Sequence, residues 1–273
     1  MTPQQVPHGV RAPDRLLLWL EQRALFELGA MAAAAPWLRW LGRGDQHPVL
    51  VLPGFTASDV STTPLRWQLR TWGYWAHGWR LGRNLGPTPA VLSGLVDRVT
   101  SLHQRHGRKV TLIGWSLGGI YARELARAFP DSVRSVITLG SPYRMTPGDR
   151  SSLSGLLDRL VGNFDHGVVE SWVAEDDRQP LTLPATSIYS KTDGVVRWYT
   201  CIDKAGPLRE NIEVLGSHSG LVVNPSVLYV LANRLAQPEG AWRPFEPPGP
   251  LRRLYPEPAV WSGGAVDAPT VPV

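Results

Sequence analysis

Short apolar runs alternate with amphipathic stretches through the middle of the chain, and this rhythm predicts strands that alternate with helices. The run Pro-Val-Leu-Val-Leu at 48–52 has no polar alternation, which is typical of a strand buried on both faces of a parallel sheet. Because parallel strands need right-handed crossovers, the pattern indicates an α/β fold with a mostly parallel sheet flanked by helices. Further strands are predicted at 74–81, 109–113, 133–139, 185–189 and 211–215.

Helices are predicted between these strands from apolar spacing and from the residues at their ends. One begins near Thr62 or Thr63, with Pro64 in its first turn and Gly73 beyond its end. The remaining helices are expected at 90–105, at 120–129 before Pro130, and at 225–235.

Three segments do not follow this rhythm. Residues 1–47 form an N-terminal helical segment, and its helix over 14–35 either covers the sheet or touches lipid through its aromatic residues. Residues 141–183 interrupt the core of 48–237, either as a small cap or lid over a pocket or as a longer surface excursion of two helices. Residues 238–273 hold nine of the 25 prolines and are expected to form an extended or partly disordered arm.

Composition narrows the class of protein without identifying it. The 273 residues suffice for one large core, and 43% hydrophobic and 19% charged residues are ordinary for a globular protein. The net charge of +5 reflects either a solvated basic surface or a weak attraction to anionic lipid. No run of five like charges occurs, so no nucleic-acid partner is expected.

The compartment is inferred only by default. Cys201 is the single cysteine, so no internal disulfide argues for an oxidising compartment. The apolar N-terminal stretch is interrupted by Glu21, Arg23 and Glu27, which argues against a signal peptide and against a membrane span. We therefore expect a cytoplasmic protein with no transmembrane segment.

The most informative motif is Gly-Trp-Ser-Leu-Gly at 114–118. An apolar, β-branched run precedes it and a helical stretch follows it, so Ser116 is expected on a sharp strand-to-helix turn with its hydroxyl exposed. The glycines at 114, 118 and 119 allow neighbouring backbone to pack closely around such a turn. This arrangement predicts Ser116 as a nucleophile.

A serine hydroxyl needs a base, and the base needs an acid that orients it. His218 lies in a loop of small residues between the last strand and the last helix, where it can approach Ser116. Asp193 follows the strand at 185–189 and is the candidate acid, although it also suits a turn with Gly194. Asp203, Asp176 and Asp177 are the alternatives.

The same chemistry needs two backbone donors for an oxyanion. The N–H of Leu117 is one candidate, because it directly follows the nucleophile at a helix N-terminus. The N–H of Phe55 is the other, because Gly54 lets the loop after the first strand turn close to the serine. His103 and His106 lie three residues apart, but no carboxylate or cysteine completes a metal site, so neither a metal nor a cofactor is expected.

These motifs together resemble α/β-hydrolases of the lipase and esterase type. The resemblance covers about residues 48–236 and is carried by four motifs: Pro53-Gly54-Phe55, Gly114-Trp115-Ser116-Leu117-Gly118-Gly119, Thr192-Asp193-Gly194 and Ser217-His218. The order Ser116, Asp193, His218 is the order that this fold uses. One departure is Pro53-Gly54 where compact bacterial lipases commonly carry His-Gly. The resemblance implies an α/β-hydrolase fold and a Ser-His-Asp triad.

The expected activity is hydrolysis of a small-molecule carboxylic ester through an acyl-enzyme, with lipids among the candidate substrates. An acyltransferase would use the same triad, and a non-catalytic binding protein on this fold is a further alternative. Six tryptophans near the predicted site loops either form a wall for an apolar acyl chain or fill the core; they are Trp67, Trp72, Trp75, Trp79, Trp115 and Trp198.

Overall fold

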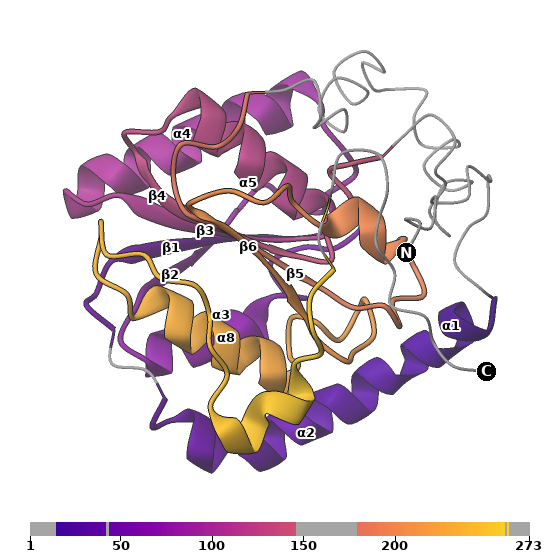
Figure 1. Ribbon diagram of the computed structural model, residues 1–273. Helices are drawn as coiled ribbons and strands as arrows, with labels where there is room; N and C mark the ends of the chain where they lie inside the picture. Colours follow the sequence, from indigo (N-terminus) through magenta and orange to yellow (C-terminus); the bar gives the residue numbers. More distant parts are fainter. Residues whose placement is uncertain (1–14, 42–43, 146–178, 260, 262–273) are drawn as a thin grey trace.

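The computed structural model describes residues 15–41, 44–145, 179–259 and 261, and it contains one six-stranded sheet whose strands are all parallel (Figure 1). The strand order is β2-β1-β3-β4-β5-β6. The predicted parallel sheet is therefore confirmed. The strands are β1 (Pro48–Leu52), β2 (Trp75–Gly78), β3 (Val110–Trp115), β4 (Val133–Leu139), β5 (Ala185–Tyr189) and β6 (Arg209–Glu213).

The strand order reverses at β1, and this reversal determines where a site can form. The chain runs from β1 outward to β2 and then returns to the other side of β1 as β3. Loops on either side of such a switch point diverge and leave a crevice at the carboxyl ends of the strands. In the β1–β3 ladder Leu52 pairs with Gly114, so the loop after β1 begins beside the turn that holds Ser116.

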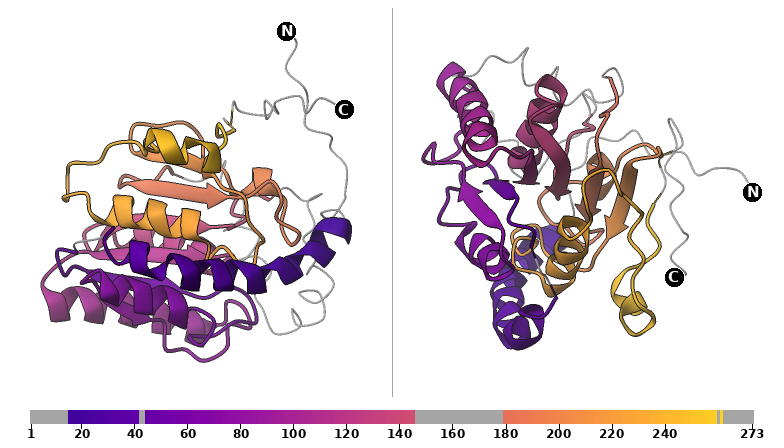
Figure 2. Two further views of the ribbon diagram at one scale, coloured as in Figure 1. Left: turned by 90° about the horizontal axis from the view of Figure 1, so that it is seen from below. Right: turned by 90° about the vertical axis from the view of Figure 1, so that its left-hand side faces the viewer.

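Helices cover both faces of the sheet (Figures 1 and 2). Along β1, Val49 and Val51 join the core beneath one face, and Leu50 and Leu52 join the core beneath the other. This alternation follows from the two-residue period of a strand and explains why the run at 48–52 is apolar throughout. On one face lie α4 (Pro89–His106) and α5 (Leu117–Ala128), and on the other lie α3 (Thr63–Thr71) and α8 (Pro225–Leu235).

The N-terminal segment forms a long, nearly continuous helix outside α8 (Figure 2). It comprises α1 (Arg15–Trp19), the 3₁₀ turn η1 (Leu20–Arg23) and α2 (Ala24–Leu38). Met31 and Leu38 are buried in the core, and the Trp37 ring stacks on Tyr229 at 5.7 Å. The helix therefore covers the helix layer rather than the sheet itself.

Much of the apolar surface of this N-terminal helix is exposed. Trp19, Leu25 and Phe26 have exposed fractions of 67%, 76% and 81%. Among the described residues, no helix combines the length and apolar character that crossing a membrane requires.

The predicted elements agree with the structure except at some boundaries. The second strand covers 75–78 rather than 74–81, and the last covers 209–213 rather than 211–215. Pairing of Ala185 with Arg209 determines where β6 begins, so it starts on polar residues that an apolar pattern cannot indicate. Most of the predicted cap, residues 146–178, lies outside the described residues, and so do Asp176 and Asp177.

The described part of the C-terminal arm is packed rather than simply extended. It contains a 3₁₀ helix, η5 (Gly249–Leu254), and Phe245 and Tyr255 pack around Tyr229 of α8. The Tyr255 hydroxyl donates to the Ser226 carbonyl at 2.9 Å. These aromatic contacts attach the arm to α8. The high proline content of the arm did not indicate them.

Replacing Leu112 by alanine is expected to destabilise the fold by about 2–5 kcal/mol, because it leaves a cavity in the middle of a central strand. Leu112 has no exposed surface and belongs to the core on the α4–α5 face. Chemical denaturation would measure the change in the free energy of unfolding. Leu25→Ala, at an exposed position of α2, is the matched control and should change this free energy by less than about 0.5 kcal/mol. Equal effects of the two substitutions would contradict the assignment of Leu112 to the core.

Candidate active site

Ser116 lies on a strained turn between β3 and α5. Its φ of 53° and ψ of −124° are unfavourable for a residue with a side chain. The Ser116 N–H donates to the Leu139 carbonyl at 2.9 Å, and its carbonyl accepts from Gly119 at the same distance. A Cβ atom at Gly114 would lie 2.3 Å from the Gly118 carbonyl oxygen, so only glycine fits beneath the turn. Close backbone packing thus maintains the strained conformation and leaves the serine at the edge of the sheet.

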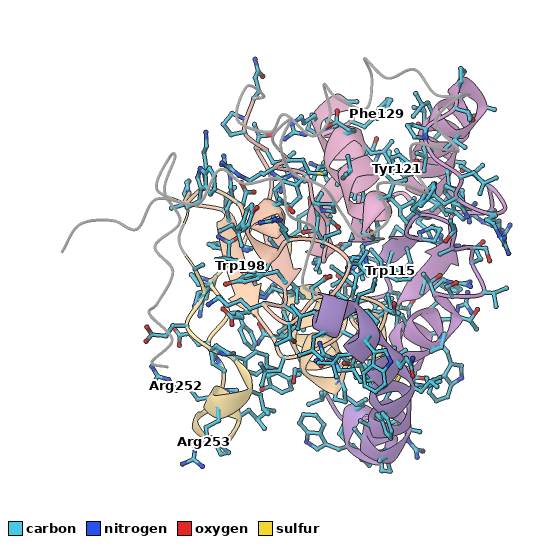
Figure 3. All side chains as sticks on the ribbon, turned by 90° about the vertical axis from the view of Figure 1, so that its right-hand side faces the viewer. Trp115, Tyr121, Phe129, Trp198, Arg252 and Arg253 are labelled. Atoms are coloured by element: carbon cyan, nitrogen blue, oxygen red, sulfur yellow. The ribbon has the colours of Figure 1, made fainter. Side chains whose placement is uncertain are left out.

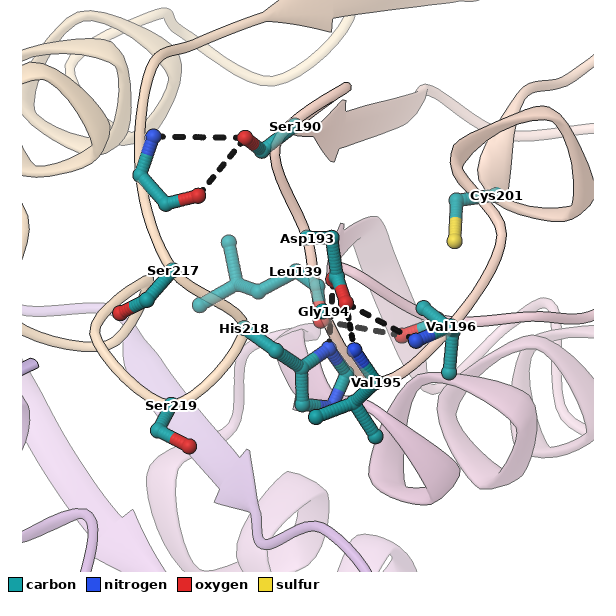
Figure 4. Close-up of polar contacts among 12 residues, drawn as sticks. Leu139, Ser190, Asp193, Gly194, Val195, Val196, Cys201, Ser217, His218 and Ser219 are labelled. Carbon is teal, nitrogen blue, oxygen red and sulfur yellow. Dashed lines mark hydrogen bonds and ion pairs between the residues drawn. The ribbon is translucent and has the colours of Figure 1, made fainter. Parts of the chain in front are cut away.

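His218 and Asp193 lie together in the loops after β6 and β5 (Figure 4). His218 Nδ1 is 2.6 Å from Asp193 Oδ2, and both residues are buried. The other oxygen, Asp193 Oδ1, accepts from the N–H groups of Val195 and Val196 at 2.8 and 2.9 Å. Asp193 therefore both stabilises its own turn and contacts the imidazole. With the proton on Nδ1, the Nε2 atom is left as the acceptor.

The environment of His218 raises its pKa above the usual 6.5. Burial is the largest influence and by itself lowers the pKa, because the imidazolium loses its hydration. The negative charges of Asp193 and Glu21 and the hydrogen bond to Asp193 oppose burial and outweigh it. The site thus stabilises the protonated imidazole that forms when a base takes a proton.

The loop that holds His218 lies against the serine turn. The Trp115 indole N–H donates to the His218 carbonyl at 3.0 Å, and the two rings are 6.0 Å apart (Figure 3 labels Trp115). Gly140 directly follows Leu139, whose carbonyl accepts from the Ser116 N–H. A Cβ atom at Gly140 would lie 3.1 Å from His218 Nδ1, so the His218 ring lies close to the strand end that contacts Ser116. Within the described residues the Ser116 hydroxyl makes no hydrogen bond. Such contacts commonly form only when substrate is bound.

The loop after β1 approaches the same serine. A Cβ atom at Gly54 would lie 3.1 Å from Ser116 Cβ, so glycine permits this approach. The N–H groups of Phe55 and Leu117 have no acceptor among the described residues. Two unpaired donors beside a serine are what an oxyanion requires.

Asn84 holds the loop after β1 in place, and no sequence pattern indicates this role. Its side chain is fully buried and donates to the Pro53 carbonyl at 2.8 Å. Its backbone carbonyl accepts from Thr56 at 2.7 Å, and Thr56 has a φ of 61°. A lone asparagine between predicted elements resembles any loop residue, so only the three-dimensional contacts indicate its role.

Asp203, one of the alternative acids, forms ion pairs with two arginines. Its carboxylate lies 2.9 Å from Arg123 and 3.9 Å from Arg209, and both Asp203 and Arg123 are buried. An ion pair of this kind has a structural role, because removing one partner leaves an unpaired buried charge.

The tryptophans near the predicted loops are not a single wall. Trp72 and Trp79 fill the core, whereas Trp67 and Trp75 are largely exposed. Of the two alternatives, the core is therefore confirmed for Trp72 and Trp79, whereas Trp67 on α3 and Trp75 on β2 lie at the surface. Trp115 contacts the His218 loop, and Trp198 stacks on Tyr189 beyond the end of β5 (Figure 3).

The histidines at 103 and 106 do not lie together as a metal pair. His103 Nδ1 lies 3.1 Å from the Arg108 carbonyl, and His106 Nε2 lies 3.1 Å from His77 Nε2. In the described part of the chain, no cluster of three or more His, Cys, Asp or Glu side chains could hold a metal ion.

Three charged residues of the N-terminal helix reach the site, and sequence reasoning missed their role. Glu21 accepts from the His218 N–H, Arg23 donates to Thr192, and Glu27 accepts from Ser217. In the sequence they appeared only as charges that interrupt an apolar helix. Burial, the largest influence, raises the pKa of Glu27 despite its hydrogen bonds to Ser217 and the nearby Arg23.

Comparisons with known proteins agree with the fold. A family model described as alpha/beta hydrolase fold matches residues 52–183. The pimeloyl-[acyl-carrier protein] methyl ester esterase of Proteus mirabilis is 34% identical over 99 residues, which cover 34% of this chain and 37% of that protein. The matched region thus spans little more than a third of that relative's length.

Solved structures of lipases are similar in fold over most of the chain. A mature Bacillus licheniformis lipase has a TM-score of 0.53 at 18% identity and covers 70% of this chain and 92% of its own. Aspergillus fumigatus lipase B has a TM-score of 0.56 at 15% identity, covering 74% of this chain and 55% of its own. At such identities the likeness is one of fold.

Replacing Asp193 by asparagine is expected to lower the pKa of His218, because burial would then be opposed mainly by Glu21. In the unsubstituted protein the pKa should lie above 6.5. An NMR titration of the imidazole nitrogens would measure both values. Asp97→Asn, at an exposed position on α4, is the matched control and should leave the titration unchanged. An unchanged His218 pKa in Asp193→Asn would contradict the pairing.

Proposed function

Because the chain belongs to the α/β-hydrolase superfamily, we propose that it is a serine hydrolase that cleaves carboxylic esters through an acyl-enzyme. The observation that carries the proposal is the short contact between His218 and Asp193 beside a strained serine turn. An aspartate that holds a buried imidazole in one tautomer near a half-buried serine suits the activation of a hydroxyl for acyl transfer.

In the first half of the proposed reaction, Ser116 Oγ attacks the ester carbonyl carbon. His218 Nε2 takes the hydroxyl proton, and Asp193 stabilises the resulting imidazolium through Nδ1. The carbonyl oxygen becomes an oxyanion that accepts hydrogen bonds from the N–H groups of Phe55 and Leu117. The tetrahedral intermediate then collapses, and the imidazolium gives its proton to the departing alcohol.

In the second half, water replaces the alcohol. His218 Nε2 takes a proton from the water as it attacks the acyl carbon, and the same two N–H groups bind the second oxyanion. Collapse of this intermediate breaks the bond to Ser116 Oγ, which regains its proton from His218. The products are a carboxylic acid and free enzyme.

We propose an ester with an apolar acyl group as the substrate. Two observations support this proposal: the lipases that share the fold, and Trp115, whose ring lies between the serine turn and the His218 loop. An aromatic surface beside the nucleophile favours a hydrocarbon chain over a charged one.

Ser116→Ala is expected to abolish labelling by a fluorophosphonate probe and to lower kcat for an activated ester by roughly 10⁴- to 10⁶-fold. Without the hydroxyl no acyl-enzyme can form. Mass spectrometry of the labelled protein and steady-state kinetics would measure the two effects. The matched control is Ser101→Ala, a substitution at an exposed position on α4, which should leave both the labelling and kcat unchanged. Full esterase activity in Ser116→Ala would overturn the proposed mechanism.

Among p-nitrophenyl esters, kcat/KM is expected to be highest for medium or long acyl chains. Each buried methylene contributes about 0.8 kcal/mol, so kcat/KM should rise by roughly 15-fold per two-carbon step until the acyl site is filled. A series from acetate to palmitate, assayed below the critical micelle concentration of each ester, would measure this dependence. A clear optimum at acetate would contradict the apolar-acyl proposal and leave the serine mechanism intact.

A further inference from the structure

The N-terminal helix meets both loops of the proposed triad through a single carboxylate. Glu21 Oε1 accepts from the Gly194 N–H at 2.9 Å and from the His218 N–H at 2.9 Å. Glu21 Oε2 accepts from the Ser219 N–H at 3.0 Å. Gly194 directly follows Asp193, so one side chain fixes the backbone beside the acid and the backbone of the base together. Hydrogen bonds from N–H groups to a carboxylate are among the stronger ones in proteins.

Neighbouring residues of the same helix reinforce this connection. Arg23 Nη2 donates to the Thr192 carbonyl at 2.6 Å and to the Gly216 carbonyl at 2.8 Å, so it also joins the two loops. Glu27 Oε1 accepts from the Ser217 N–H at 2.8 Å. Acceptors and donors on the helix therefore match backbone donors and acceptors of both loops.

The fit between helix and loops is close enough to exclude side chains. A Cβ atom at Gly194 would lie 2.3 Å from the carbonyl oxygen of Leu17, on the backbone of α1. A Cβ atom at Gly220 would overlap the Glu27 carboxylate. Gly194 is therefore required for the backbone of the helix to lie where it does, whereas a side chain at Gly220 would displace the Glu27 carboxylate.

We propose that Glu21 is a positioning residue of the active site, which sets the geometry of the Asp193–His218 pair through the backbone of both loops. This inference rests on the proposed function, since it assigns Glu21 a part in the same reaction. The N-terminal helix, which precedes the first strand of the sheet, then belongs to the catalytic machinery. Glu21 does not touch the reacting atoms and acts through His218 and Asp193.

Glu21 also contributes charge at the base. Its negative charge raises the pKa of His218. Glu21 accepts hydrogen bonds from the N–H groups of His218 and of the next residue, Ser219. These bonds hold the negative charge of Glu21 close to the imidazole. Within the described part of the chain, two groups of charged or titratable side chains lie around His218. One is Asp193 and Cys201 beyond β5, and the other is Glu21, Arg23 and Glu27 on the N-terminal helix.

Glu21→Gln tests the proposal, because glutamine keeps the size of the side chain but loses the charge and replaces one acceptor by a donor. We expect kcat per active site to fall by about 10- to 100-fold, as displacement of catalytic groups by about 1 Å does, with KM changed by less than about threefold. Protonated His218 cannot accept the serine proton. In Glu21→Gln the negative charge that raises the pKa of His218 is gone, so this pKa should fall. The acid limb of the kcat/KM profile should therefore move to lower pH.

Three controls separate positioning from mere stability. Titration with a fluorophosphonate gives kcat per folded site, so a loss of folded protein does not count as a loss of catalysis. Glu257→Gln, at an exposed position of the C-terminal arm, removes the same charge at a distance and should change neither kcat nor the pH profile. Glu21→Asp keeps the charge but shortens the reach. It should lower kcat while restoring the acid limb toward its original position.

Wild-type kcat per titrated site together with an unchanged pH profile in Glu21→Gln would overturn the proposal. Should Glu21→Gln not fold, wild-type kcat per site in Glu21→Asp would overturn it instead. Ser116→Ala distinguishes this failure from failure of the proposed function. If the serine variant is inactive and the Glu21 variants are fully active, the serine mechanism stands and the positioning role does not.

Discussion

The site depends on one close contact between backbones, where the end of β1 meets the first turn of α5. A Cβ atom at Gly118 would lie 2.3 Å from the Leu52 carbonyl oxygen, so the two segments approach too closely for a side chain to fit between them. The β1–β3 register brings Leu52 opposite Gly114, and the glycines permit the approach that the register demands. The strained Ser116 turn and the Gly54–Phe55 loop consequently lie side by side. A larger residue at 118 would separate the serine from one of its two proposed oxyanion donors.

The spacing of apolar residues predicts the elements of the fold that depend on neighbouring residues in the sequence. Strands and helices were predictable because burial imposes periods of two and of 3.6 residues, and because glycine and proline mark their ends. The boundary of β6 was not predictable, since pairing with β5 extends it over polar residues. Ser116, His218 and Asp193 could be proposed because each follows a predicted strand, and parallel strands bring their carboxyl ends together.

The supporting residues were not predictable, for a physical reason. Glu21 is separated from His218 by 197 residues and Asn84 from Pro53 by 31, and each contact pairs an ordinary polar side chain with backbone groups. Backbone donors and acceptors carry no sequence signal, because every residue has them. A carboxylate that binds them looks in the sequence like any charge on a helix surface. Motifs therefore indicate reactive atoms, whereas the contacts that orient those atoms become visible only in three dimensions.

Two buried aspartates show how the surroundings decide the role of one chemical group. Asp203 faces the guanidinium of Arg123, a partner that carries a permanent positive charge. Asp193 faces an imidazole, whose charge changes near neutral pH, and two backbone N–H groups that compensate part of its charge at all times. A carboxylate paired with a fixed cation meets a charge that does not change. One that faces an imidazole can stabilise a charge that appears and disappears, and this is the property that acyl transfer at Ser116 would use.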